Sequence, residues 1–480
     1  MKNLSAWWCG AAWALAARGA AGAGTALAGY VPVNDVQQHA RIDLDLSDLD
    51  ALLLAARWAD AGALYAGGRH SDKGQGVLRD LRGLSTGLEA KAKPLSPPLA
   101  DFELFRSYYG RGDYADAFVQ QELVNAGNSS LTGNVTLDTV ARRELVMKGV
   151  QLQGVAMYVL YELAAAISKC SAGSAGASLN WDEGAAFYVG SLSAAPGASP
   201  STGFLFYAFS NKRCIAFGTC GPDRVSVANR RAITAFSRGL ALVAQGRCAD
   251  AALQMAVVRK QLQVALLQGV LWYTLQASLG GTLKDRAEAW AMTRGLLPWL
   301  HSSSPRDAAT VASIVSSALS GVVRGGHGNE TSVDHAAILR AVYGSMGALC
   351  ISCADLGVNA IVGAGLRCNS DAVTVADHCK ALVTSEAAME IAPSQDAPRA
   401  GINVGLIVGL LVALTLVLLA VGVLVWKLSK VDGSKASAGT LPASGAWTQA
   451  PTAASDTPAA SGTPAASGTP VATNQELDRV

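Results

Sequence analysis

Apolar side chains recur every three or four residues along most of the first 350 positions of the chain. This spacing is the period of an α-helix that buries one face. Short clusters of Gly, Ser and Pro interrupt the pattern, and they predict loops between helices that pack antiparallel to their neighbours. The expected helices cover 52–65, 140–167, 230–276 with a break near Gly246, 286–300, 308–323 and 334–349. The pattern therefore predicts an all-α fold.

The first 28 residues have the organisation of a secretory signal peptide. Met1 and Lys2 precede an apolar run over residues 4–17, and Ala26-Leu27-Ala28 then supplies a small-residue cleavage motif. Such a leader directs the chain out of the cytoplasm and is removed. We therefore expect the mature protein to begin after residue 28.

A second apolar run, at 404–426, has the length and composition of a transmembrane helix. It contains no charge and Thr415 is its only polar side chain, so it can cross a hydrocarbon core of roughly 30 Å. Lys427 and Lys430 follow at once, and the positive-inside rule places them in the cytoplasm. The sequence therefore predicts an extracellular all-α domain at 29–400, one membrane helix within 401–426 and a disordered cytoplasmic tail at 427–480, where Thr-Pro-Ala-Ala-Ser-Gly units repeat.

Several segments of the predicted extracellular domain occur twice. The segment Gln153-Gly154-Val155-x-x-Tyr158 reappears as Gln268-Gly269-Val270-x-x-Tyr273. Upstream, residues 112–117 have a counterpart at 246–251, and downstream the pattern Glu-x-x-Ala-x-x-x-Gly-x-Leu occurs at 183–192 and at 288–297. Three matches in the same order predict an internal duplication of a multi-helix unit, at about 112–192 and again at about 246–297.

The cysteines fit a secreted domain. Cys9 lies in the leader, and the eight others form an even set, which is typical of disulfide bonds in an oxidising compartment. Spacing leaves the connectivity open, although Cys214 with Cys220 and Cys368 with Cys379 are the natural local pairs. A redox or metal pair at Cys350-x-x-Cys353 is the less favoured interpretation, because no second pair of this kind accompanies it. The disulfide candidates are Cys170, Cys214, Cys220, Cys248, Cys350, Cys353, Cys368 and Cys379.

Three Asn-x-Ser/Thr sequons predict glycosylated loops in the same domain, at Asn128, Asn134 and Asn329. The net charge of +2 comes without any basic run, so nucleic-acid binding has no support. None of the six histidines lies in an H-E-x-x-H motif, and we find no other supported catalytic motif. The sequence therefore predicts a glycoprotein that is not an enzyme.

Three strings resemble the iron-assimilating, low-iron-inducible periplasmic proteins of algae. They are residues 107–116, residues 181–191 and residues 211–220, and the most specific is Glu183-x-x-Ala186-Phe187-Tyr188-x-Gly190-Ser191. The resemblance covers most of residues 40–390. It implies an extracellular or periplasmic protein that takes part in iron uptake when iron is scarce, here with an added membrane anchor.

An iron protein needs ligands, and ferric ion, as a hard cation, favours oxygen donors. The residues that could supply them lie in the first copy of the duplicated unit. Tyr158 and Glu162 are one helical turn apart, while Asp182, Glu183 and Tyr188 are close in sequence. These five side chains are the predicted metal ligands. A Tyr and a Glu that recur in buried helices also fit a structural hydrogen-bonded pair, and this alternative carries more weight from sequence alone.

The second copy keeps only part of this oxygen set. Tyr273 and Glu288 correspond to Tyr158 and Glu183, but Ala277 stands where Glu162 is expected. Thr293 likewise replaces Tyr188. We therefore expect one metal site, in the first half, rather than two equal sites.

Two functions remain open. The first is an iron-binding protein at the plasma membrane or cell surface, anchored by one helix, which assists iron assimilation and hands iron to a permease or another surface protein. The second is a helical-repeat surface receptor or scaffold that binds another protein. Iron binding by the purified protein distinguishes the two.

Overall fold

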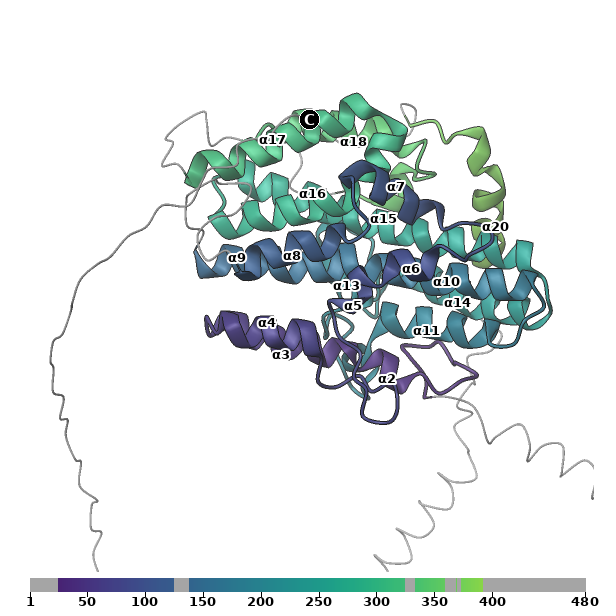
Figure 1. The fold of residues 1–480 in the computed structure, drawn as a ribbon. Coiled ribbons are helices and arrows are strands. Elements are labelled where there is room, and N and C mark those ends of the chain that lie inside the picture. The colour runs from purple at the N-terminus through teal and green to yellow at the C-terminus, as the bar shows by residue number, and fades with distance from the viewer. Residues whose placement is uncertain (1–24, 125–137, 324–332, 359–367, 369–372, 392–480) are drawn as a thin grey trace, which may run out of the picture. The chain divides into compact units, whose positions relative to one another are not determined.

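The computed structural model describes residues 25–124, 138–323, 333–358, 368 and 373–391 (Figure 1). Several predicted features lie outside these ranges: the leader as far as Gly24, the three sequons, the membrane helix within 401–426 and the tail at 427–480. Leu27, inside the expected cleavage motif, is described and fully buried, and its backbone pairs with that of Tyr30.

The described ranges are helical and contain isolated β-bridges but no strand, which confirms the predicted all-α class. One continuous apolar core runs through the domain. The helices of the N-terminal part are α2 (Gln37–Ala40), α3 (Ile42–Leu54), α4 (Trp58–Gly67), α5 (Gly83–Thr86), α6 (Leu88–Ala92), α7 (Ala100–Tyr109) and α8 (Tyr114–Val124). Those that follow are α9 (Thr139–Gly149), the π-helix η1 (Val150–Val155), α10 (Ala156–Ser171), α11 (Ala177–Val189), α12 (Ser191–Ala194), α13 (Phe206–Phe217), α14 (Val227–Ala244), α15 (Cys248–Ser278), α16 (Leu283–Ser303), α17 (Pro305–Val323), α18 (His335–Met346), α19 (Cys353–Leu356), the 3₁₀ turn η4 (Asp377–Cys379) and α20 (Lys380–Ile391).

Two long helical segments form the centre of the domain. One is the continuous run of α9, η1 and α10, and the other is α15 (Figure 1). Helices α10, α11, α14 and α15 pack in a ring, while α9, α15, α16 and α17 form the neighbouring layer. Among the described helices, the run Thr139–Ser171 is long and apolar enough to cross a membrane, but 94% of its most apolar window is buried within the protein. Its apolar surface therefore serves the core.

Local sequence signals explain where several helices begin and how closely they pack. Thr282 and Asp285 form a capping box that starts α16, and Ser226 caps α14 through the backbone N–H of Asn229. Gly239 of α14 lies against Trp181 of α11, where an added Cβ would come within 1.8 Å of the indole. Only glycine permits this approach, and the Trp181 indole N–H donates to the carbonyl of Phe236 at 2.8 Å.

The predicted single helix at 52–65 is wrong. The chain forms α3 and α4 instead, because Ala56 adopts a positive φ of 55° and interrupts the helix between them. The expected break near Gly246 is present between α14 and α15, where Gly246 adopts a φ of +70° that glycine tolerates.

The four disulfide bonds use all eight candidate cysteines. The local pair Cys214–Cys220 is confirmed, but the expected pair Cys368–Cys379 is wrong. The two cysteines of the C-x-x-C motif instead bond to different partners, Cys350 outside α19 and Cys353 at its first residue. The remaining bonds are Cys170–Cys248, Cys350–Cys379 and Cys353–Cys368.

The repeated segments occupy comparable helix hairpins. The first Gln-Gly-Val-x-x-Tyr segment spans η1 and α10, which pairs with α11, and the second lies in α15, which pairs with α16. The upstream match is less regular: residues 114–117 begin the separate helix α8, whereas residues 248–251 begin α15 itself. Each segment therefore lies in a pair of packed helices, but the helices that precede the two pairs differ.

Candidate functional site

The structure brings together three of the five predicted ligands. Tyr158 and Glu162 lie on α10, and Glu183 lies on the antiparallel helix α11. Asn180, also on α11, donates from its amide nitrogen to Glu162 at 2.5 Å and to Glu183 at 3.4 Å. The two carboxylates are therefore held at the same point of the hairpin.

A histidine from the N-terminal part of the chain completes this group. His39 of α2 places its Nε2 atom 3.2 Å from Glu183 Oε1, and only 16% and 14% of the two side chains is exposed. The His39 ring packs edge-on against Phe187. We refer to His39, Tyr158, Glu162 and Glu183 as the Glu162 cluster. It offers two carboxylates, a phenol and an imidazole.

The two carboxylates of the Glu162 cluster differ in acidity. Burial raises the pKa of Glu162 to about 8, and the neighbouring negative charge of Glu183 adds to this effect. Burial also pushes the pKa of Glu183 upward, but the hydrogen bond with His39 and the charge of Arg79 outweigh it and leave this pKa below its usual value. The two shifts therefore favour a proton on Glu162 and a negative charge on Glu183.

Cations lie beside the cluster. Lys91 of α6 donates to the Tyr158 hydroxyl at 2.7 Å, and Arg79 lies over the Phe187 ring. Burial lowers the pKa of both Lys91 and Arg79, while the Glu162 carboxylate opposes this shift. Burial and the charge of Glu162 raise the pKa of Tyr158, so its phenol is neutral.

The other two predicted ligands, Asp182 and Tyr188, are engaged elsewhere. Both are fully buried. Asp182 accepts hydrogen bonds from the Tyr30 hydroxyl, from the backbone N–H groups of Val33 and Asn34 at 3.1 and 2.9 Å, and from the Asn34 amide at 2.7 Å. It therefore holds the N-terminal segment onto α11.

Tyr188 lies at the end of α11 and donates its hydroxyl to Asn229 Oδ1 at 2.7 Å. Asn229 in turn donates to Asn211 and to the carbonyl of Tyr207. The phenol therefore belongs to a hydrogen-bond network between α11, α13 and α14. None of these hydrogen bonds connects Asp182 or Tyr188 to a residue of the Glu162 cluster.

Sequence reasoning did not select His39, Arg79 or Lys91. Each lies far from Glu183 in the chain, and none belongs to a motif of known spacing. The packing of α2 and α6 on the α10–α11 hairpin places His39 and Lys91 here, and Arg79 reaches the hairpin from the segment between α4 and α5. No sequence signal could have identified them without the fold.

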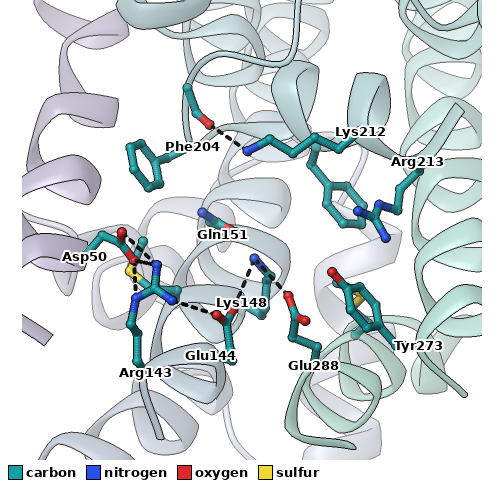
Figure 2. Close-up of a pocket in the computed structure, with 14 residues that line it drawn as sticks. Asp50, Arg143, Glu144, Lys148, Gln151, Phe204, Lys212, Arg213, Tyr273 and Glu288 are labelled. Carbon is teal, nitrogen blue, oxygen red and sulfur yellow. Dashed lines mark hydrogen bonds and ion pairs between the residues drawn. The ribbon is translucent and has the colours of Figure 1, made fainter. Parts of the chain in front are cut away.

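The counterparts in the second hairpin line a separate cavity of about 210 Å³, which we call the Glu288 cavity (Figure 2). Tyr273 of α15 and Glu288 of α16 both line it. Ala277 supplies no carboxylate, but Glu144 of α9 does, so this half also contains two acids and a tyrosine. The sequence comparison missed Glu144 because it lies outside the matched segments.

Lysine side chains neutralise these acids. Lys284 Nζ lies 2.7 Å from Glu288 Oε2. Lys148 Nζ lies 3.5 Å from Glu144 and 3.7 Å from Glu288 (Figure 2). Burial raises the pKa of Tyr273, although Arg213 opposes this shift. The second hairpin therefore pairs its acids with built-in cations, whereas the Glu162 cluster holds a proton.

The chain is thus a helical, disulfide-bonded protein with a buried group of carboxylate, phenol and imidazole donors. Its sequence matches the family described as low iron-inducible periplasmic protein over residues 6–377, and the chain belongs to that family. Membership connects it with iron assimilation under low iron and with a periplasmic or cell-surface location. No curated protein sequence and no solved structure matches the chain.

Proposed function

We propose that the protein binds iron at the Glu162 cluster and assists iron assimilation at the cell surface. The observation that carries the proposal is the Glu162–Glu183 pair, a buried and a nearly buried carboxylate that share the Asn180 amide as a donor. A buried acid pair of this kind is destabilised by its own charge, and a cation relieves the repulsion by replacing the proton. Family membership supports iron as that cation.

The donors of the cluster fit ferric iron. Glu162, Glu183 and Tyr158 supply hard oxygen atoms, and His39 supplies a nitrogen. A bound cation would favour the phenolate form of Tyr158, against the burial that keeps it neutral. Lys91 would then give up its bond to this hydroxyl. Asp182 and Tyr188 serve the fold in this proposal.

Calorimetric titration of the purified full-length protein with ferric and ferrous iron tests the proposal. We expect Glu183→Gln and Tyr158→Phe each to weaken iron binding at least tenfold. Tyr188→Phe is the matched control, because it removes a hydroxyl from an equally buried tyrosine of the same hairpin. A wild-type protein that binds no iron would overturn the proposal and favour the receptor or scaffold function. Equal losses in Tyr158→Phe and Tyr188→Phe would reject the Glu162 cluster as the site.

We further propose that the apolar run within 401–426 anchors the protein in the membrane with residues 29–400 outside, where the domain can pass iron to a permease. The support is the uncharged composition of this run and the lysines that follow it. Carbonate extraction of cell membranes tests the anchor: the full chain should remain in the pellet, and a chain ending at residue 400 should be released into the supernatant.

A further inference from the structure

The Glu288 cavity contains more positive groups than its acids neutralise. Arg143 makes a two-pronged ion pair with Asp50, at 2.7 and 2.8 Å, and also contacts Glu144 at 2.8 Å. Lys148 and Lys284 contact Glu144 and Glu288, as described above. Each acid that lines the cavity therefore already has a cation within contact distance.

Two cations of α13, Lys212 and Arg213, are left over. The Nε and Nη1 atoms of Arg213 are buried and have no hydrogen-bond partner among the described residues. Its guanidinium lies over the ring faces of Tyr273 and Phe209, at 5.0 and 5.9 Å from the centroids. Within the described part of the chain, the one hydrogen bond of Lys212 Nζ is to the carbonyl of Gly203, at 3.5 Å. Because an unpaired buried guanidinium N–H is costly, an anion in the cavity would supply the missing acceptor.

The positions of Lys212 and Arg213 restrict the kind of anion that fits the cavity. Figure 2 shows Lys212 and Arg213 on one side of the cavity and the Asp50–Arg143 pair on another. A carboxylate matches the flat edge of a guanidinium and accepts two hydrogen bonds from it. On the far side, Glu144 and Glu288 repel further negative charge but can accept a hydrogen bond from a hydroxyl group.

Apolar side chains supply the rest of the lining. Phe204, Phe209, Met147 and Met292 contribute surface that a bare inorganic ion would leave uncovered. A carbon skeleton would pack against them. We propose that the Glu288 cavity binds a small organic hydroxycarboxylate with at least two carboxylates, which are held by Arg213 and Lys212 while the hydroxyl donates to Glu144 or Glu288.

This site is separate from the Glu162 cluster, and its occupant has the opposite charge. The two hairpins therefore diverge in function: the first takes a cation and the second takes an organic anion. The inference does not depend on iron binding, so both can be tested on one preparation.

Calorimetry on the full-length protein, freed of metal by a chelator and dialysis, tests the site at constant ionic strength. The probes are citrate, tricarballylate, which lacks the hydroxyl of citrate, and inorganic phosphate. We expect citrate to bind, tricarballylate to bind at least fivefold more weakly, and phosphate to bind more weakly still. Arg213→Gln and the more exposed Lys212→Gln should each weaken citrate binding at least tenfold.

Two control variants sharpen the result. Arg106→Gln removes an exposed arginine that pairs with Glu103 far from the cavity, and it should leave citrate binding unchanged. Glu183→Gln should also leave it unchanged, even if iron binding is lost. Thermal melting confirms that each variant is folded. A wild type that binds no citrate, a folded Arg213→Gln that binds it normally, or a preference for phosphate over citrate would each overturn the proposal.

Discussion

Glu162 and Glu183 lie on opposite helices of one hairpin, yet their carboxylates accept hydrogen bonds from the same nitrogen, Asn180 Nδ2. Asn180 is itself fixed by Lys169, whose Nζ donates to its Oδ1 atom at 2.6 Å. The amide is thereby oriented with its donors toward the acids. The two carboxylates remain together because a positioned neutral donor, rather than a cation, bridges them.

The raised pKa of Glu162 predicts a particular dependence of stability on pH. Between its ordinary value of 4.5 and about 8, the folded protein holds a proton that the unfolded chain has lost. The free energy of unfolding should therefore fall as pH rises through this window, by at most about 1.4 kcal/mol per pH unit. The lowered pKa of Glu183 affects stability at lower pH than this window, and there the free energy of unfolding falls as pH falls.

Urea denaturation at several pH values measures this effect. Glu162→Gln should flatten the profile between pH 5 and 8 and should be more stable than the wild type at pH 8. Glu103→Gln, an exposed acid on α7, serves as the control and should follow the wild-type curve. Parallel profiles for the wild type and Glu162→Gln would contradict the assignment of the proton to this residue.

Iron binding should release the proton from Glu162. If a ferric ion replaces it, binding at pH 7 liberates at least one proton, and affinity rises as pH increases toward 8. Titrations in buffers of different ionisation enthalpy give the number of protons released. The same titration on Glu162→Gln should show about one proton fewer. An unchanged proton count would place the iron elsewhere.

The disulfide bonds should contribute more to stability when they close longer loops, although only with the logarithm of loop length. Cys170–Cys248 joins the end of α10 to the start of α15 across 78 residues, whereas Cys214–Cys220 spans six. Chain entropy predicts losses of about 4.5 kcal/mol and about 2 kcal/mol in the free energy of unfolding when the respective pairs become serine. Denaturation under non-reducing conditions measures both, and a larger loss for the short loop would show that chain entropy does not decide the outcome here.

The two glutamines of the repeated segment should respond differently to substitution. Gln268 donates to the carbonyl of Leu356 at 2.8 Å and to Thr219 Oγ1 at 3.1 Å. Gln153 is equally buried, but its amide oxygen and nitrogen have no partner among the described residues. Gln268→Leu should therefore cost about 1–3 kcal/mol, while Gln153→Leu should be neutral or stabilising. Thermal or urea denaturation checks the contrast, and equal losses would show that Gln153 has a partner.

The sequence predicted the parts of this molecule that depend on local spacing. The helical period located α9, α10 and α14 to α18, and the short loop between Cys214 and Cys220 predicted their bond. The positions of Tyr158 and Glu183 followed from a pattern that recurs on two hairpins, and Glu162 was selected because it lies one helical turn after Tyr158. Contacts between distant segments could not be predicted this way.

His39 and Glu144 are two residues whose contacts could not be predicted from local spacing. His39 reaches Glu183 only because Asp182 fastens residues 30–34 to α11, which positions α2 nearby. Asp182 looks like a ligand in sequence because it stands beside Glu183, but adjacent residues on a helix point about 100° apart. Glu144 meets Glu288 through the packing of α9 on α16, which no match between the two copies records.

The π-helix η1 lies in one continuous helical run between residues of the Glu288 cavity and residues of the Glu162 cluster. Residues before it, among them Glu144 and Lys148, line the Glu288 cavity, and residues after it supply Tyr158 and Glu162. A π-turn adds one residue to the helical repeat, which turns everything beyond it by about 100° relative to an uninterrupted α-helix. Deleting one residue from 150–155 would leave a continuous rod but rotate one set of side chains out of its site. A single extra residue in η1 therefore sets how far the Glu162 side chain is rotated about the helix axis relative to the Glu144 side chain.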